Sequence, residues 1–255
     1  MRTTDFSQVL FDALQYSGND RHNITDETFA QFRDFAHSRL REAWEMNQWT
    51  DVCRIADFTT TQDESGTNYF VPSDDASEIL GVWNKNPQDS TRAKELTYQI
   101  YNNGNEIRIV IPSIISVGSY MYRQKCPQLT GDPYSPTVVY YSGAQVYFDS
   151  GSGTGALTPV QGKPHSGNFY ICITPSTSVG QSPSTHPQYW EKVNIPYVFG
   201  SFMSWGAAAN WYVSETMIQE ATTIEAKANQ MLEQELDKLL RQQGQFGRMN
   251  VFKTY

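Results

Sequence analysis

The sequence predicts an α+β protein in which the terminal helices pack as one helical bundle and a β-rich antiparallel insertion lies between them. Apolar residues recur at three- and four-residue steps near both ends of the chain, which is typical of amphipathic helices. Alternating segments separated by Gly, Pro and Asn turns fill the middle. The chain has 255 residues, enough for a sizeable core, and its 13% of aromatic residues excludes disorder. We expect residues 1–57 and 188–255 to form the helical core, 58–126 the β-sheet insertion and 127–187 a small loop-rich β unit.

The N-terminal region predicts two helices joined as an αα-hairpin. The first is expected over Phe6–Tyr16, with Gly18 ending it. The second begins after Thr25, whose hydroxyl is a suitable N-cap. Its apolar stripe consists of Phe29, Phe32, Ala36, Leu40, Ala43 and Trp44. The opposite face is predicted to be solvated and carries Arg33, Asp34, Arg39, Arg41 and Glu42.

The middle of the chain predicts antiparallel sheet over Phe58–Lys125. Leu96–Tyr101 and Ile107–Ile111 alternate on either side of Asn103-Gly104-Asn105, a strong hairpin turn. Thr91–Leu96 is open to a second interpretation as a short helix.

The segment from Pro127 to Pro187 is rich in Gly, Pro, Ser and Tyr, which indicates a β unit with little core of its own. The strands expected there are Thr137–Tyr141, Gln145–Phe148 and Asn168–Thr174.

Two further helices are expected near the C-terminus. One begins near Pro196 and presents Phe199, Phe202 and Ala209 on one face. The other runs from Thr216 to Gln243, and Gly244 is its expected stop.

Composition excludes several classes of protein. With 19 basic and 27 acidic residues the net charge is −8, which argues against a dedicated nucleic-acid binder. No apolar run has the length of a membrane span, and the N-terminus lacks the pattern of a signal peptide. Three widely spaced cysteines form neither a disulfide framework nor a metal motif. We therefore expect a soluble protein made in a reducing cytoplasm.

The usual catalytic constellations are missing from the sequence. The four histidines are scattered, and no nucleophile elbow occurs. The glycine run Gly151–Gly155 is not followed by a helix or by a Gly-Lys-Ser/Thr sequence, so it does not fit a phosphate loop. We expect no enzyme, no cofactor and no metal.

The order of elements resembles the head–tail adaptor proteins of tailed bacteriophages, also called connector or tail tubular A-type proteins. The resemblance covers about two-thirds of the chain and rests on element order with weak local patterns. The segments that carry the resemblance are a helix pair ending in Trp44-Glu-Met-Asn-Gln-Trp49, the stretches Ile79–Pro87 and Tyr189–Pro196, and a long final helix that contains Glu235–Gly247.

The resemblance implies a homo-oligomeric ring, twelve-fold in that family, located in the virion neck and made in the host bacterial cytoplasm. Its partners would be the portal protein above, the next neck or tail protein below, and DNA that passes through the lumen without specific binding. A stopper or tail-terminator neck protein is the nearest alternative. The tail after Gly244 would add as a strand or arm to the portal or to a neighbouring subunit, through Phe246, Arg248, Met249, Val251, Phe252 and Tyr255.

A second stretch, residues 138–193, resembles the small chitin-binding-type module of carbohydrate-active enzymes. Its Tyr, Gly, Val, Tyr and Trp pattern implies sugar stacking by Tyr141, Tyr147, Tyr170 and Trp190. A long Gly/Ser insertion departs from that pattern. This resemblance supports a different function, a glycan-binding protein acting at a bacterial surface.

Overall fold

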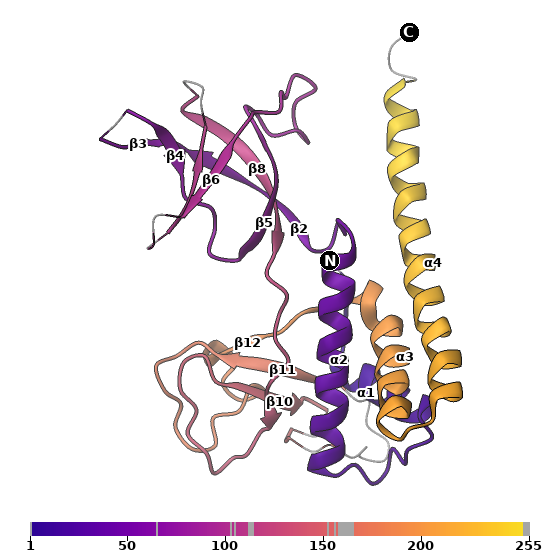
Figure 1. Ribbon diagram of the computed structural model, residues 1–255. Helices are drawn as coiled ribbons and strands as arrows, with labels where there is room; N and C mark the ends of the chain where they lie inside the picture. Colours follow the sequence, from indigo (N-terminus) through magenta and orange to yellow (C-terminus); the bar gives the residue numbers. More distant parts are fainter. Residues whose placement is uncertain are drawn as a thin grey trace. The chain divides into compact units, whose positions relative to one another are not determined.

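The computed structural model describes residues 2–64, 66–102, 104, 106–111, 115–151, 153–155, 157 and 166–251, with the backbone alone for 242–251. The chain forms two compact units (Figure 1). We call Met1–Asn47 together with Pro127–Tyr255 the mixed unit, and Gln48–Cys126 the β unit.

The first two predicted helices are confirmed as α1 (Phe6–Tyr16) and α2 (Asp26–Met46). The Thr25 side chain accepts a hydrogen bond from the Thr28 N–H and so caps α2. All six residues of the predicted α2 stripe are buried. The predicted αα-hairpin is only partly right, because α1 and α2 each pack mainly against α3 (Tyr197–Ser214) rather than against each other.

A four-stranded sheet of the mixed unit packs against the helices. Its order is β12 (Trp190–Lys192), β11 (Gly167–Cys172), β10 (Gln145–Asp149) and β9 (Asp132–Pro133). Strand alternation sends Tyr147 and Phe169 toward the helices, where both rings contact Phe6 and Phe29. The opposite face has a core of its own, which the sequence did not lead us to expect: Tyr134, Val146, Phe148, Cys172 and Trp190.

The prediction of a terminal helical bundle with an antiparallel β insertion is therefore wrong. Helices and sheet share one core in the mixed unit, because β10 and β11 have apolar side chains on both faces. The sheet is also mixed rather than antiparallel, since β9 pairs parallel with β10. The predicted strand over Thr137–Tyr141 does not form, and only Tyr141 makes a single bridge, to Ser176.

The two ends of the mixed unit are tied together. β1 (Thr3–Thr4) pairs antiparallel with β13 (Ile195–Pro196), just before α3 begins. A short 3-10 helix, η1 (Pro187–Tyr189), precedes β12. The last helix, α4 (Ile218–Val251), packs along α3. It does not end at Gly244 as predicted, because an isolated glycine costs a helix only about 1 kcal/mol.

The β unit consists of two sheets around one core. The first has the order β2 (Cys53–Thr59), β8 (Val117–Gln124) and β5 (Ala76–Trp83). The second has the order β3 (Thr61–Gln62), β4 (Asn68–Phe70), β7 (Ile107–Val110) and β6 (Gln99–Asn102). The predicted hairpin is confirmed as the antiparallel β6–β7 pair, whose turn contains Gly104 at φ 90°. Strands of both sheets contribute to the core: Phe58, Phe70, Val82, Ile109, Ile111, Tyr120 and Tyr122.

Among the described residues, no helix combines the length and apolar character needed to cross a membrane.

Candidate functional site

Arg39 lies where α2, α3 and α4 meet. Its guanidinium donates to both oxygens of Glu225 on α4, at 2.8 Å from Nη1 and 2.5 Å from Nη2. Nη2 also donates to the Asn210 side chain of α3 at 2.7 Å. The Arg39 side chain is only 11% exposed, so the predicted solvated face of α2 is wrong at this position. The sequence carried one weak signal of this site: Gly206 begins a run of four small residues in α3, which allows another element to approach closely.

Arg33 is a second exception on that face of α2. Its side chain is 13% exposed, and Nη1 donates to the Asp132 carboxylate at 2.8 Å and to the carbonyl of Gly131 at 3.3 Å. The arginine therefore joins α2 to the start of β9. Two cations of the supposed solvated face thus hold other elements of the mixed unit in place.

Large apolar side chains are exposed at the turn between α3 and α4. Val213, Met217 and Ile218 are 54%, 40% and 59% exposed. Farther along α4, Leu240 is 54% exposed, while Ala221, Ala228, Leu232 and Leu239 of the same helix are buried. Exposed apolar side chains of α4 therefore lie at two separate places, at its start and at Leu240.

Two of the four residues predicted to stack on sugars are buried. Tyr147 is 1% exposed, and burial, helped by Asp149 and Asp5, raises the pKa of its hydroxyl. Trp190 is 5% exposed, and its Nε1 donates to the Gln181 carbonyl at 3.2 Å. A ring without a free face has no stacking surface, so the predicted role does not fit these two residues.

The other two aromatic residues differ in accessibility. Tyr170 is half-buried against Phe148, and burial raises the pKa of its hydroxyl. Tyr141 is 65% exposed. Ile173, the residue directly after β11, is also exposed. Of the four, Tyr141 alone presents a ring largely open to solvent.

The six residues predicted to contact the portal or a neighbour fall at the end of the chain. Phe246, Arg248, Met249 and Val251 belong to the helical backbone of α4, and their side chains are outside the described residues. Phe252 and Tyr255 lie beyond the described residues altogether. The predicted strand-like tail is thus replaced by helix at least as far as Val251.

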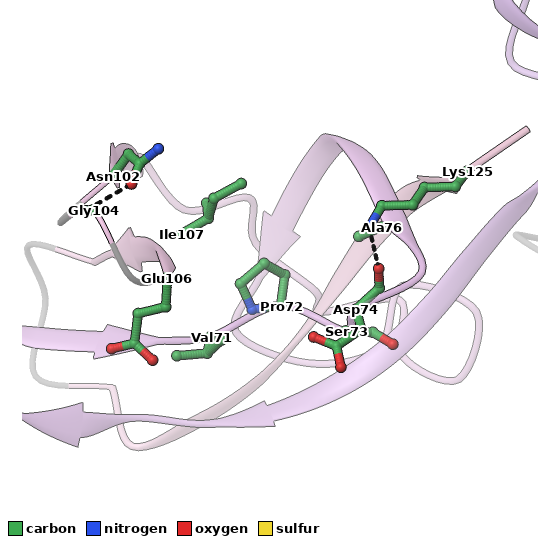
Figure 2. A pocket seen from close by; sticks show the side chains of 10 residues that line it. All are labelled: Val71, Pro72, Ser73, Asp74, Ala76, Asn102, Gly104, Glu106, Ile107 and Lys125. Carbon is green, nitrogen blue, oxygen red and sulfur yellow. Dashed lines mark hydrogen bonds between the residues drawn. The ribbon is translucent and has the colours of Figure 1, made fainter. Parts of the chain in front are cut away.

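A cavity of about 400 Å³ opens in the β unit (Figure 2). Lys125 at its rim donates from Nζ to the Asp74 carbonyl at 2.6 Å, and Glu106 pairs with Arg108 at 2.6 Å. Both charged groups thus have a partner within the protein, and the remaining wall is apolar or neutral apart from Asp74. The lining residues are Val71, Pro72, Ser73, Asp74, Ala76, Asn102, Gly104, Glu106, Ile107 and Lys125.

The cavity fits a contact with an apolar side chain better than a chemical step. Val71 and Ile107 are 47% and 50% exposed, and they line it together with Pro72. Within the described part of the chain, no cluster of His, Cys, Asp or Glu has the arrangement of a metal site.

No known protein family matches this sequence, and no curated protein matches it either.

Proposed function

We propose that this protein is a structural component of a tailed-phage virion, the adaptor whose copies form a ring beneath the portal. The ring would join the capsid to the tail and let DNA pass. The protein would be made in the cytoplasm of the host bacterium and reside in the virion neck. The portal protein, the next neck or tail protein and other copies of this chain would be its partners.

The length of α4 carries the proposal. α4 has 34 residues and its packing partner α3 has 18, so the two helices span about 51 Å and about 27 Å at 1.5 Å per residue. Since α4 is nearly twice as long as α3, a large part of α4 extends beyond α3 and cannot pack on it. A ring subunit needs such surface for its neighbours.

The exposed apolar side chains supply a second argument. Val213, Met217 and Ile218 lie at one end of the α3–α4 pair, and Leu240 lies far along α4. Head-to-tail rings join two different patches of the same chain, which is compatible with apolar groups at two separate places.

Net charge supports passage of DNA without binding. Each copy carries −8, and a ring multiplies that charge around its lumen. Phosphates are repelled by such a wall, so DNA in transit would not adhere to it.

The end of α4 is the proposed portal contact. Its backbone is helical to Val251, so the contact would be a helix in a groove rather than an added strand. Apolar Phe246, Met249 and Val251 and basic Arg248 lie on this last stretch, which has no acidic residue after Asp237.

The test is the mass of the purified protein, alone and mixed with the portal ring of the same genome, by native mass spectrometry. The expected result is a portal complex that gains many copies of 29.0 kDa. A variant that lacks residues 245–255 should remain folded, lose only the helical circular dichroism signal of residues 245–251, and lose portal binding. A portal ring whose mass does not change overturns the proposal.

Tyr141 favours a second candidate, glycan binding by the sheet of the mixed unit. Retention on chitin or peptidoglycan beads would support it if Tyr141→Ala abolished retention. Tyr101→Ala is the matched control, since Tyr101 is 54% exposed but lies in the β unit. Equal retention of both variants would rule out stacking by Tyr141.

A further inference from the structure

The turn between α3 and α4 holds exposed apolar side chains on a fixed backbone. Val213, Met217 and Ile218 are 54%, 40% and 59% exposed. Thr216 has a left-handed φ of 61°. Its N–H donates to the Val213 carbonyl at 3.0 Å, and the Met217 N–H donates to the Tyr212 carbonyl at 2.9 Å. These two bonds form the Schellman arrangement that ends a helix, so the apolar groups are held in place at the surface. We call residues 212–220 the corner.

The corner also contains a hollow of about 290 Å³. The end of α3 and the first turns of α4 line it: Tyr212, Gln219, Glu220, Thr223 and Ile224. The Tyr212 hydroxyl donates to the Tyr16 carbonyl at 3.2 Å, which fixes one wall. Exposed apolar groups with a hollow among them fit a partner that inserts one large side chain, as the anchor residues of interfaces do.

The corner is negatively charged. Glu215 and Glu220 are exposed, and the sequence has no Lys or Arg from position 211 to position 226. The start of α2 also reaches this end of α3, since the Gln31 side chain donates to the Ser214 hydroxyl at 3.3 Å. The segment before it adds three acidic residues against one arginine and one histidine: Asp20, Arg21, His22, Asp26 and Glu27. A partner segment for the corner should therefore be both apolar and basic.

The last residues of the chain have this complementary character. No acidic side chain follows Asp237, while Arg241, Arg248 and Lys253 are basic. Large apolar residues occur in the same stretch: Phe246, Met249, Val251, Phe252 and Tyr255. We call residues 245–255 the C-terminal segment. Its charge is opposite to that of the corner, and its aromatic residues are of the kind that anchors interfaces.

The C-terminal segment cannot reach the corner of its own copy. α3 and α4 are joined at the corner, and α4 runs on past α3 as one helix to Val251 (Figure 1). At 1.5 Å per residue, position 245 lies about 40 Å from Ile218 along this helix. The four residues after Val251 extend over at most about 14 Å. A contact between the segment and the corner therefore joins two copies.

We propose that the C-terminal segment of one copy docks as a helix on the corner of a second copy. Its basic residues would lie against Glu215 and Glu220, with one aromatic ring in the hollow. Two different surfaces of the chain meet, so the contact is head-to-tail and can continue from copy to copy. The inference goes beyond the proposed function. Because the same segment is the proposed portal contact, a copy bound to the portal has released the corner of its neighbour.

The experiment is sedimentation velocity of the full-length protein at increasing concentrations, with native mass spectrometry to identify the species. Wild type should form species that grow in steps of 29.0 kDa. A corner variant, Glu215→Lys with Glu220→Lys, should associate at least about tenfold more weakly, because like charges then meet. Asp89→Lys with Glu191→Lys is the matched control. Both of these side chains are exposed outside the corner, so this variant should associate like wild type.

Reversal of the charges on both sides tests the pairing itself. A variant that adds Arg248→Glu and Lys253→Glu to the corner variant restores opposite charges and should associate again. Circular dichroism checks that each variant is folded. A wild type that stays monomeric at every concentration overturns the inference, and so does a corner variant that associates as strongly as wild type. Failure of the doubly reversed variant to associate overturns the basic-on-acidic pairing.

Portal rings separate this inference from the proposed function. The corner variant keeps the C-terminal segment, so it should bind portal rings as wild type does. Excess portal rings should also remove wild-type copies from the associated species. Association that depends on the corner, without portal binding by wild type, supports the contact between copies and overturns the adaptor proposal. Portal rings that gain copies of a protein without such association overturn the inference and leave the adaptor proposal standing.

Discussion

Arg39 on α2 and Glu225 on α4 form a bidentate ion pair, although they are 186 positions apart in the sequence. The pair joins the first long helix of the chain to the last one. Arg39 also reaches Asn210 on α3, so one side chain connects three helices. Its Nε is buried without a hydrogen-bond partner among the described residues, which makes the remaining contacts more important for its burial.

Removal of this arginine should destabilise the protein strongly. We expect Arg39→Ala to lower the free energy of unfolding by about 2–4 kcal/mol, because it leaves Glu225 partly buried without its cation. Urea unfolding measures the change. Arg41→Ala is the control: Arg41 pairs with Glu45, but both side chains are more than half exposed, so about 1 kcal/mol or less is expected. Equal losses for the two variants would contradict the structural role of Arg39.

Gly206 makes room for Arg39. A Cβ at position 206 would lie 2.7 Å from Arg39 Cδ, closer than packed carbon atoms approach. Gly206→Ala should therefore destabilise the protein, although alanine by itself favours a helix by about 1 kcal/mol. Thermal unfolding of Gly206→Ala measures this effect, and Gly200→Ala is the comparison. A Cβ at position 200 would lie 3.3 Å from its nearest neighbour, the Thr4 methyl carbon. A stabilised Gly206→Ala variant would show that the helices separate easily.

His37 should make stability depend on pH. Its Nδ1 accepts the Leu129 N–H at 3.3 Å, which requires an unprotonated nitrogen. Burial is the main cause that lowers the pKa of His37. The Asp34 carboxylate raises this pKa, while the positive charges of Arg41 and Arg33 lower it further. With the folded pKa below the unfolded value of about 6.5, this stability is complete above that value and is lost as the pH falls toward the folded pKa.

The measurement is the melting temperature between about pH 7.5 and about pH 5 for wild type and His37→Gln. Glutamine can accept the same N–H without titrating, so the variant should lose less stability over this range. Parallel curves for the two proteins would exclude His37 as the source of the pH dependence.

Asn168 should stabilise the first turn of α1. Its Oδ1 accepts the Phe6 N–H at 3.2 Å, and its Nδ2 donates to Asp5 at 2.8 Å, so β11 supplies a cap that Asp5 does not. Asn168→Ala should cost about 1–3 kcal/mol, because Asn168 is buried and a helix N–H loses its acceptor. Asn168→Asp keeps the acceptor but faces Asp5 with a like charge, and denaturant unfolding of both variants separates the two contributions. No change in either variant would contradict the capping role.

Local structure was largely predictable from the chain. The bounds of α1, the Thr25 cap, the buried stripe of α2 and the β6–β7 hairpin follow from residue periodicity and turn chemistry. These features depend on neighbours within a few positions, so a single sequence contains the necessary information. By contrast, Gly244 was misinterpreted as a helix stop, since one glycine is a weak local signal.

Tertiary structure alone decided where the charged and aromatic residues belong. The sequence alone predicts Arg39 to be a surface residue of α2, but α3 and α4 bury it in the folded protein. It predicts Tyr147 to be a sugar-stacking ring, but Phe6 and Phe29 cover that ring. The sequence by itself determined most of the helices and strands, because helix periodicity, caps and hairpin turns are local, although the strand expected over Thr137–Tyr141 did not form. Which faces of the segments of the mixed unit are buried was decided by contacts between residues more than a hundred positions apart, such as Phe6 with Tyr147 and Arg39 with Glu225.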